Sequence, residues 1–145
     1  MSEAPDHDAE VVVNERTGER VTFVSETPEL LSMLVEWPRP GRRAAEHLHP
    51  GMTETWEVLD GTAGFLVDGV EVEGGHGTMV TAPAGRRHLA WNAGDGPARL
   101  RIEMRPALRW REFTCRFFAG EDPLALLAEF TDEITLPLPD ESAQT

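Results

Sequence analysis

Short runs of alternating hydrophobic and polar residues dominate the chain, and they predict β-strands. The pattern is clearest over 99–105, where Leu100, Ile102 and Met104 alternate with charged residues. In a strand these three side chains share one face. Similar runs between 43 and 106 are separated by Gly, Pro, Asn and Asp, which end strands and form turns. Many short strands with closely spaced turns indicate a β-sandwich or a small barrel.

The N-terminal part of the chain predicts extra strands before this region. Two β-rich runs, EVVVN and RVTFVS, flank residues 15–19, which have the composition of a hairpin turn. The run 29–37 fits either a strand or a short helix, and the Pro- and Gly-rich segment 37–41 ends it. No internal repeat or long linker divides the chain, so a single domain is predicted over 10–135.

The C-terminal part predicts helical structure. Residues 108–118 fit either a helix or a further strand. Asp122-Pro123 is a typical helix start, with the aspartate as N-cap and the proline at the first helical position. In the helix that follows, Leu124, Leu127 and Phe130 would share one face. A short C-terminal helix is therefore expected after the strands.

Composition narrows the classes of function. The formal net charge is −13, and all 13 cationic side chains are Arg. Such a surface repels phosphate backbones and anionic lipid, so binding to nucleic acid or to a membrane is not expected. Residues 1–9 are interpreted as a disordered acidic lead and 136–145 as an acidic tail, with no secretion signal. Cys115 is the only cysteine, which excludes an intramolecular disulfide and fits a cytoplasmic protein.

Three histidines and a glutamate form the candidate site. On a strand, His47 and His49 point to the same side because side chains two residues apart share a face. Pro50-Gly51 then turns the chain, and Glu54 begins the next strand. The side to which Glu54 points cannot be followed through the turn, so we hypothesise that its carboxylate approaches the two imidazoles. His88 can supply a fourth ligand from another strand. This set suits one divalent first-row metal (Fe, Mn, Ni, Co, Cu or Zn), and an octahedral ion would keep two open positions.

These residues belong to two longer motifs that resemble the paired motifs of the cupin superfamily. The first, over 41–61, has the pattern G-x5-HLH-x4-E-x6-G. The second, over 77–92, has the pattern G-x5-PAG-x2-H-x3-N. Every defining position is filled, and the 15-residue separation of the motifs is typical of compact microbial members. The segment RTGERVTF also resembles the opening of a group of single-domain bacterial cupins.

The resemblance implies a fold and a role for each candidate residue. The implied fold is all-β: a double-stranded antiparallel cupin barrel of the jelly-roll type, with N-terminal extra strands and a short C-terminal helix. The metal ligands would be His47, His49, Glu54 and His88, near one mouth of the barrel. Glu54 is also a candidate catalytic base, and the sequence leaves both of its roles open. Because cupins often dimerise, a homodimer is expected.

The aromatic residues divide into two groups. Trp56 and Val58 share the strand face of Glu54, which makes Trp56 the candidate wall of a substrate pocket, with plain core packing as the alternative. A second group is interpreted as core or dimer contact: Trp110, Phe113, Phe117 and Phe118. No ligand role is expected for His7, which falls in the disordered lead, or for His76, which falls in a solvated Gly-Gly-His-Gly turn.

Together these observations predict a metal-dependent enzyme that acts on a small molecule. The leading hypothesis is an oxygenase resembling quercetinase-type cupins, with an enolate, diketone or catechol-like substrate that chelates the metal. One alternative is a non-redox isomerase, cyclase or decarboxylase for a polyketide or sugar-like substrate. The other is a cupin that binds a small molecule without catalysis.

Overall fold

The computed structural model describes residues 10–42 and 45–137. The expected disordered lead over 1–9 and the tail from 138 lie outside the described residues. Within them, ten strands precede two helices. The elements are β1 (Val11–Val13), β2 (Arg20–Thr27), β3 (Leu30–Trp37), β4 (Gly41–Arg42), β5 (Thr53–Asp60), β6 (Ala63–Val67), β7 (Val70–Gly74), β8 (Met79–Ala82), β9 (His88–Asn92), β10 (Ala98–Arg105), α1 (Trp110–Phe118) and α2 (Pro123–Glu129).

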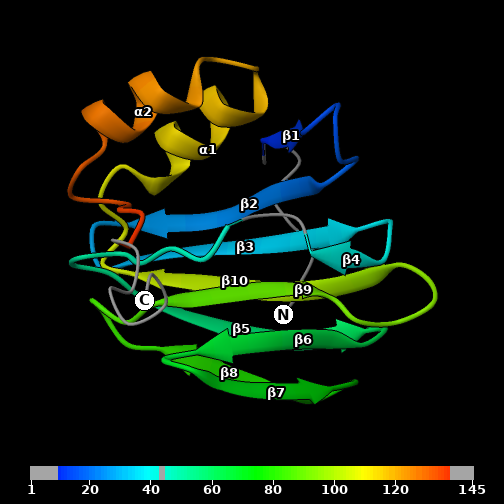
Figure 1. Ribbon diagram of the computed structural model, residues 1–145. Helices are drawn as coiled ribbons and strands as arrows, with labels where there is room; N and C mark the ends of the chain where they lie inside the picture. The colour runs from blue at the N-terminus through cyan, green and yellow to red at the C-terminus, as the bar shows by residue number, and fades with distance from the viewer. Residues whose placement is uncertain (1–9, 43–44, 138–145) are drawn as a thin grey trace, which may run out of the picture.

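Two antiparallel sheets form a jelly-roll barrel (Figure 1). The larger sheet has the strand order β1-β2-β3-β10-β5-β8, and the smaller sheet has the order β4-β9-β6-β7. The run at 29–37, which fitted a helix or a strand, is the strand β3 and lies between β2 and β10. The all-β prediction with extra N-terminal strands is confirmed, because β1 and β2 extend one edge of the larger sheet.

The core between the sheets consists of the inward-facing half of each alternating strand. Leu100 and Met104 of β10 are fully buried, and Trp56 and Val58 of β5 lie beside them. Phe65 of β6 meets them from the smaller sheet, with its ring centroid 5.3 Å from that of Trp56. Burial of each large apolar side chain stabilises the fold by roughly 1.5–3 kcal/mol. The alternation read from the sequence therefore identified the core face correctly.

The two helices lie together beyond β1 and β2, at the end of the larger sheet (Figure 1). The segment from Trp110, which fitted a helix or a strand, is helical. Asp122 caps α2 as predicted, because its Oδ1 accepts a hydrogen bond of 3.3 Å from the backbone N–H of Leu124. No helix in the described part of the chain is long and apolar enough to cross a membrane.

The predicted apolar face of α2 was wrong at one position. Leu124 is 75% exposed, whereas Leu126 and Phe130 are buried, four residues apart on one face. They form a small second core with Phe113 of α1 and with Ile134. The face that packs is set by where α1 lies, and Leu124, in the first turn of α2, points away from it. The hydrophobic spacing alone did not distinguish these two faces.

Candidate metal centre

The backbone brings the two histidine-bearing segments together. His47 and His88 form an antiparallel bridge, in which each N–H donates to the carbonyl of the other residue at 3.0 and 2.7 Å. Glu54 lies near the start of β5 and pairs with Ala82 of β8 and Met104 of β10. Backbone pairing thus positions candidate ligands from three segments of the chain. The approach of the Glu54 carboxylate to the histidines, which the turn at 50–51 left undecided in the sequence, is present in the fold.

The four side chains meet at one point. One ligand atom from each of His47, His49, Glu54 and His88 lies within 4.8 Å of the other three. His49 and His88 are each 1% exposed and Glu54 is 8% exposed, while His47 is half-buried. The ring centroids of the histidines are 4.6–5.2 Å apart. The cluster is arranged as a candidate metal site, with His47 on its accessible side.

Hydrogen bonds to backbone carbonyls fix the orientation of all three imidazoles. Nδ1 of His47 donates to the carbonyl of Ala45 at 2.9 Å, and Nδ1 of His49 donates to Glu133 at 2.7 Å. Nδ1 of His88 donates to Arg86 at 3.1 Å. Because a carbonyl only accepts, each Nδ1 carries a hydrogen, and in the neutral ring Nε2 then offers a lone pair. Second-shell bonds of this kind are typical of metal-binding histidines.

The donor atoms at the centre of the cluster fit a cation. Glu54 Oε1 lies 2.9 Å from Nε2 of His49 and 3.2 Å from Nε2 of His88. Nε2 of His88 is buried and, among the described residues, has no partner in hydrogen-bonding geometry. Three imidazole lone pairs and a carboxylate directed at one point repel one another unless a proton or a metal ion lies between them. Their number and type match a divalent first-row metal.

The protonation of these four side chains is governed by burial and by their close contact. Burial, with His88 and His49 nearby, lowers the pKa of His47 to about 4. Burial opposes ionisation of Glu54, but its contacts with Nε2 of His49 and Nε2 of His88, which donate to the carboxylate when those rings are protonated, outweigh it and hold the pKa of Glu54 below its ordinary value. Burial also acts on His88, but the Glu54 carboxylate outweighs it and raises the pKa of His88. Glu54 is therefore an anion that faces imidazole nitrogens.

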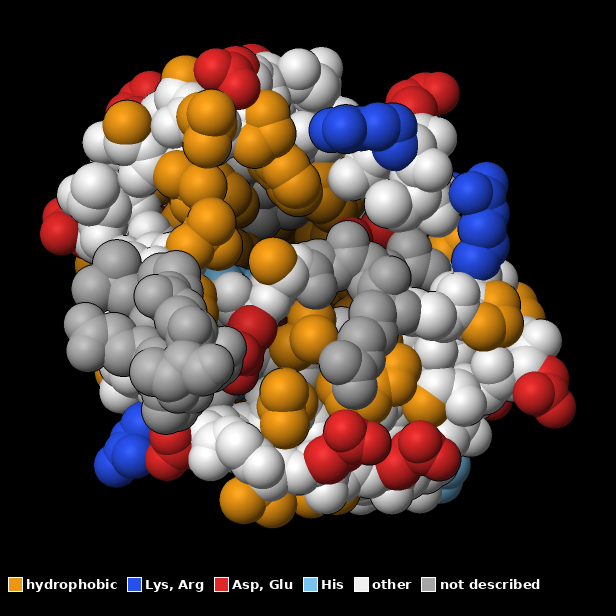
Figure 2. All heavy atoms as spheres, viewed as in Figure 1, with side chains coloured by type: hydrophobic (Ala, Val, Ile, Leu, Met, Phe, Trp, Pro, Cys, Tyr) orange, Lys and Arg blue, Asp and Glu red, His pale blue; other side chains and the backbone are white. Residues whose placement is uncertain are grey.

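A cavity of about 530 Å³ leads to this cluster, and His47, Glu54 and His88 form part of its wall. Figure 2 shows a hollow on this face of the molecule, bordered by hydrophobic side chains. The volume is in the range of small-molecule sites. Arg16, which is exposed, is the only cationic side chain among the described residues of its lining. The cavity is therefore mainly apolar, with the candidate metal site in its wall.

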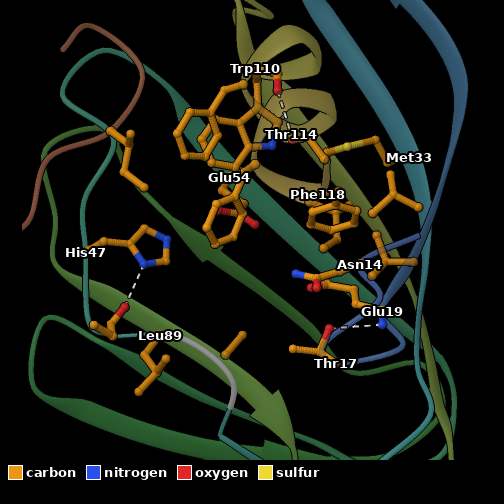
Figure 3. A pocket seen from close by; sticks show the side chains of 18 of the residues that line it. Asn14, Thr17, Glu19, Met33, His47, Glu54, Leu89, Trp110, Thr114 and Phe118 are labelled. Carbon is orange, nitrogen blue, oxygen red and sulfur yellow. Dashed lines mark hydrogen bonds between the residues drawn. The ribbon is translucent and has the colours of Figure 1, made fainter. Parts of the chain in front are cut away.

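The aromatic residues that the sequence singled out lie around this cavity. Trp56 lines it and packs edge-on against His88, with ring centroids 5.3 Å apart, so it is both a core residue and a wall residue. The interpretation of the second aromatic group as core or dimer contact was incomplete, because all four side chains also line the cavity: Trp110, Phe113, Phe117 and Phe118. Figure 3 shows Trp110 and Phe118 from α1 reaching into it. The sequence missed this because it left open whether the segment was a helix.

The two remaining histidines do not join the cluster, and the sequence analysis missed one residue that orients a candidate ligand. His76 is exposed and hydrogen bonds to the carbonyl of Leu59, away from the cluster, while His7 lies outside the described residues. Glu133, which is 3% exposed, orients His49 through its backbone carbonyl. Any residue type offers that carbonyl, so no sequence pattern could have identified it.

Comparisons with known proteins agree with this fold and site. Residues 34–104 match the sequence model of the cupin domain. Both histidine-bearing segments and most of the larger sheet lie inside this match. The chain therefore belongs to the cupin superfamily. A search of curated protein sequences found no match.

Several solved structures share the fold. KdgF from Halomonas sp. has a TM-score of 0.63 at 19% identity, over 73% of this chain and 94% of that chain. Pac13 from Streptomyces, a nucleoside dehydratase, has a TM-score of 0.59 at 17% identity, over 77% and 88%. A cupin sugar phosphate isomerase from Silicibacter pomeroyi DSS-3 has a TM-score of 0.60 at 19% identity, over 70% and 74%. At these identities the likeness concerns the fold.

Proposed function

We propose that the protein is a metal-dependent enzyme that acts on a small apolar molecule bound in the barrel cavity. The observation that carries the proposal is the buried Nε2 of His88, which lacks a partner in hydrogen-bonding geometry within the described part of the chain and is directed with two other imidazoles and a carboxylate at one point of the cavity wall. We assign His47, His49, Glu54 and His88 as the ligands. When bound, the metal would act as a Lewis acid and a template for a chelating substrate.

The lining of the cavity supports an aromatic or enolisable substrate rather than a sugar phosphate. Trp56, Trp110 and Phe118 offer flat apolar surfaces next to the cluster. Apart from the proposed metal ion, only the exposed Arg16 would neutralise a phosphate group within the described lining, and the Glu19 carboxylate would repel it. A β-diketone, flavonol or catechol matches this wall and carries two oxygens spaced so that both can bind one metal ion.

Glu54 is the residue that we expect to move a proton. Its Oε1 lies between His49 and His88, and its low pKa keeps it ionised. A strongly ionised carboxylate takes a proton only from an acidic donor, and coordination of a substrate hydroxyl to a cation makes that hydroxyl acidic. We therefore assign Oε1 of Glu54 as a ligand that also accepts the substrate proton. Trp56 and Trp110 would exclude water from this step.

We propose oxygenation of the chelated substrate as the reaction. The second candidate is a non-redox reaction, and the likeness to a nucleoside dehydratase and to a sugar phosphate isomerase favours it. The two differ in a simple requirement. Oxygenation consumes O2, whereas dehydration or isomerisation proceeds without oxygen and with a redox-inert ion such as zinc.

The test measures oxygen uptake with a β-diketone, a flavonol and a catechol. The protein is loaded with iron, manganese, nickel or zinc, and the His49→Ala variant is compared with His76→Ala, which alters an exposed histidine outside the cluster. We expect metal-dependent uptake that His49→Ala abolishes and His76→Ala leaves unchanged. Anaerobic turnover with zinc would favour the second candidate. Absence of metal-dependent turnover of any substrate would contradict the assignment as an enzyme of this class.

A further inference from the structure

The cavity has a second polar end, which the proposed chemistry does not use. Asn14, Thr17 and Glu19 line it and come from the turn between β1 and β2. Figure 3 shows Asn14 and Glu19 across the cavity from His47, with Leu89 and Phe118 along the walls between them. The two ends are therefore polar and the middle is apolar, which is the pattern of a site that binds an elongated ligand in one direction.

The side chain of Asn14 presents an unused donor to this cavity. Asn14 is 6% exposed, and its Oδ1 accepts a hydrogen bond of 3.0 Å from the backbone N–H of Arg16. This bond identifies the other terminal atom as Nδ2. Within residues 10–42 and 45–137 no hydrogen bond engages Nδ2, and Figure 3 shows it directed into the cavity. Nδ2 is not enclosed by the protein, so a ligand that enters the cavity can accept a hydrogen bond from it.

Glu19 adds an acceptor next to this donor. The backbone N–H of Asn14 donates to the carbonyl of Glu19 at 2.8 Å, which holds the two residues together across the turn. The Glu19 carboxylate is oriented by Trp37, whose Nε1 donates to Oε2 at 2.9 Å. A carboxylate accepts several hydrogen bonds, so this contact does not prevent another from a ligand. An amide donor beside an acceptor matches a hydroxyl group, which both accepts and donates.

We propose that Asn14 and Glu19 form a hydroxyl-binding subsite that selects the substrate of the proposed enzyme. The inference rests on the proposed function for one end of the ligand, where the oxygens of an aromatic or polyketide-like molecule would bind at the ion that His47, His49, Glu54 and His88 would hold. The ligand's distal hydroxyl accepts from Nδ2 of Asn14 and donates to Glu19.

The first experiment uses metal-free protein, so that the subsite is tested apart from the metal. Biphenyl and 4-hydroxybiphenyl are titrated, and binding is followed by the fluorescence of the cavity tryptophans, Trp56 and Trp110. We expect the hydroxyl compound to bind about tenfold more tightly than biphenyl, the effect of one or two hydrogen bonds. The Asn14→Asp variant keeps an acceptor for the N–H of Arg16 but loses the donor, and we expect its preference to fall to about threefold or less.

The second experiment needs no variant. The chain has two asparagines and one glutamine, so the side-chain amide signals in an ¹⁵N-labelled sample are few. Both hydrogens of the Asn92 amide are bound to the carbonyls of Trp37 and Gly96, which makes Asn92 an internal reference. We expect the Asn14 amide signals to shift with 4-hydroxybiphenyl and to stay nearly constant with biphenyl.

The outcomes separate the subsite from the enzymatic proposal. The subsite would be overturned if the wild type bound both probes equally or bound neither. It would also be overturned if the Asn14 amide signals did not shift. A hydroxyl preference that survives in folded Asn14→Asp would overturn the role of Asn14. If the preference behaves as expected while no metal-dependent turnover is found, the subsite stands and the enzymatic proposal fails.

Discussion

The carbonyl oxygen of Glu133 accepts a 2.7 Å hydrogen bond from Nδ1 of His49, across 84 residues of sequence. Leu48, which precedes this histidine, exchanges two backbone hydrogen bonds of 2.9 Å with Thr135. The segment after α2 is therefore attached to the segment that carries His47 and His49. Through this contact the C-terminal helices are coupled to the orientation of a candidate metal ligand.

This coupling predicts that Thr135→Pro weakens metal binding. The substitution removes the N–H that donates to Leu48 and restricts the backbone of the preceding residue, which displaces the Glu133 carbonyl. Loss of a partner that orients a metal-bound histidine typically costs 10–100-fold in affinity, and we expect about tenfold, measured by competition with a chelator. Thr135→Ala, which keeps the backbone N–H at this exposed position, is the control and should bind metal like the wild type.

Metal binding should stabilise the fold. A ligand that binds only the folded state at 100 times its Kd adds about 2.7 kcal/mol to the free energy of unfolding. For a chain of this length we expect the melting temperature to rise by about 5–10 °C when metal is added, and to fall again with a chelator. His88→Ala, which removes one of the proposed ligand nitrogens, should show no such rise. An equal shift in His88→Ala would argue against this cluster as the binding site.

Substitution of Glu54 should separate its two assigned roles. Glu54→Gln keeps an oxygen for the metal but loses the carboxylate that accepts a proton. We expect metal content to remain near that of the wild type and kcat to fall by about 10²-fold or more. Glu57→Gln is the control, since Glu57 lies on the other face of β5 and pairs with Arg101 at 3.7 Å. If Glu54→Gln lost its metal but turned over like the wild type once metal was added back, Glu54 would be a metal ligand and not a proton acceptor.

The structure gives a steric reason why residue 61 is a glycine, and this reason can be tested. Gly61 ends the first cupin motif at φ +78°, and a Cβ there would meet the carbonyl oxygen of Pro97 at 2.5 Å and Cα of Ala98 at 2.9 Å. Gly61→Ala should therefore lower the free energy of unfolding by about 2–4 kcal/mol in urea denaturation. Gly51→Ala is the matched control. No atom lies within 4 Å of its added Cβ, so a change within about 0.5 kcal/mol is expected.

Cys115 should react slowly with thiol reagents. Burial and the nearby Glu10 carboxylate, whose Oε1 lies 3.8 Å from Sγ, raise the pKa of the thiol. A raised pKa reduces the fraction of reactive thiolate at any pH below it, so iodoacetamide should modify Cys115 more slowly at pH 8 than it modifies a cysteine peptide. Glu10→Gln removes the negative charge and should increase the rate. A rate equal to that of the peptide in the wild type would contradict the expected environment.

The sequence by itself determined the architecture and the identity of the four candidate ligands. Alternation with period two marks the buried face of strands such as β5 and β10, because burial of every second side chain is a local property. The spacing of His47, His49 and Glu54 is likewise local, and the cupin motifs added His88. These residues could be named without coordinates.

Only the tertiary structure decided what surrounds that cluster. The Glu133 carbonyl orients His49, and the N-terminal Asn14 and the C-terminal Trp110 line one cavity, although they are far apart in the sequence. The choice of Leu126 rather than Leu124 as the buried residue of α2 depends on where α1 packs. Backbone carbonyls are the same in every residue, and the packing of distant segments leaves no period in the sequence, so neither could be predicted from local pattern.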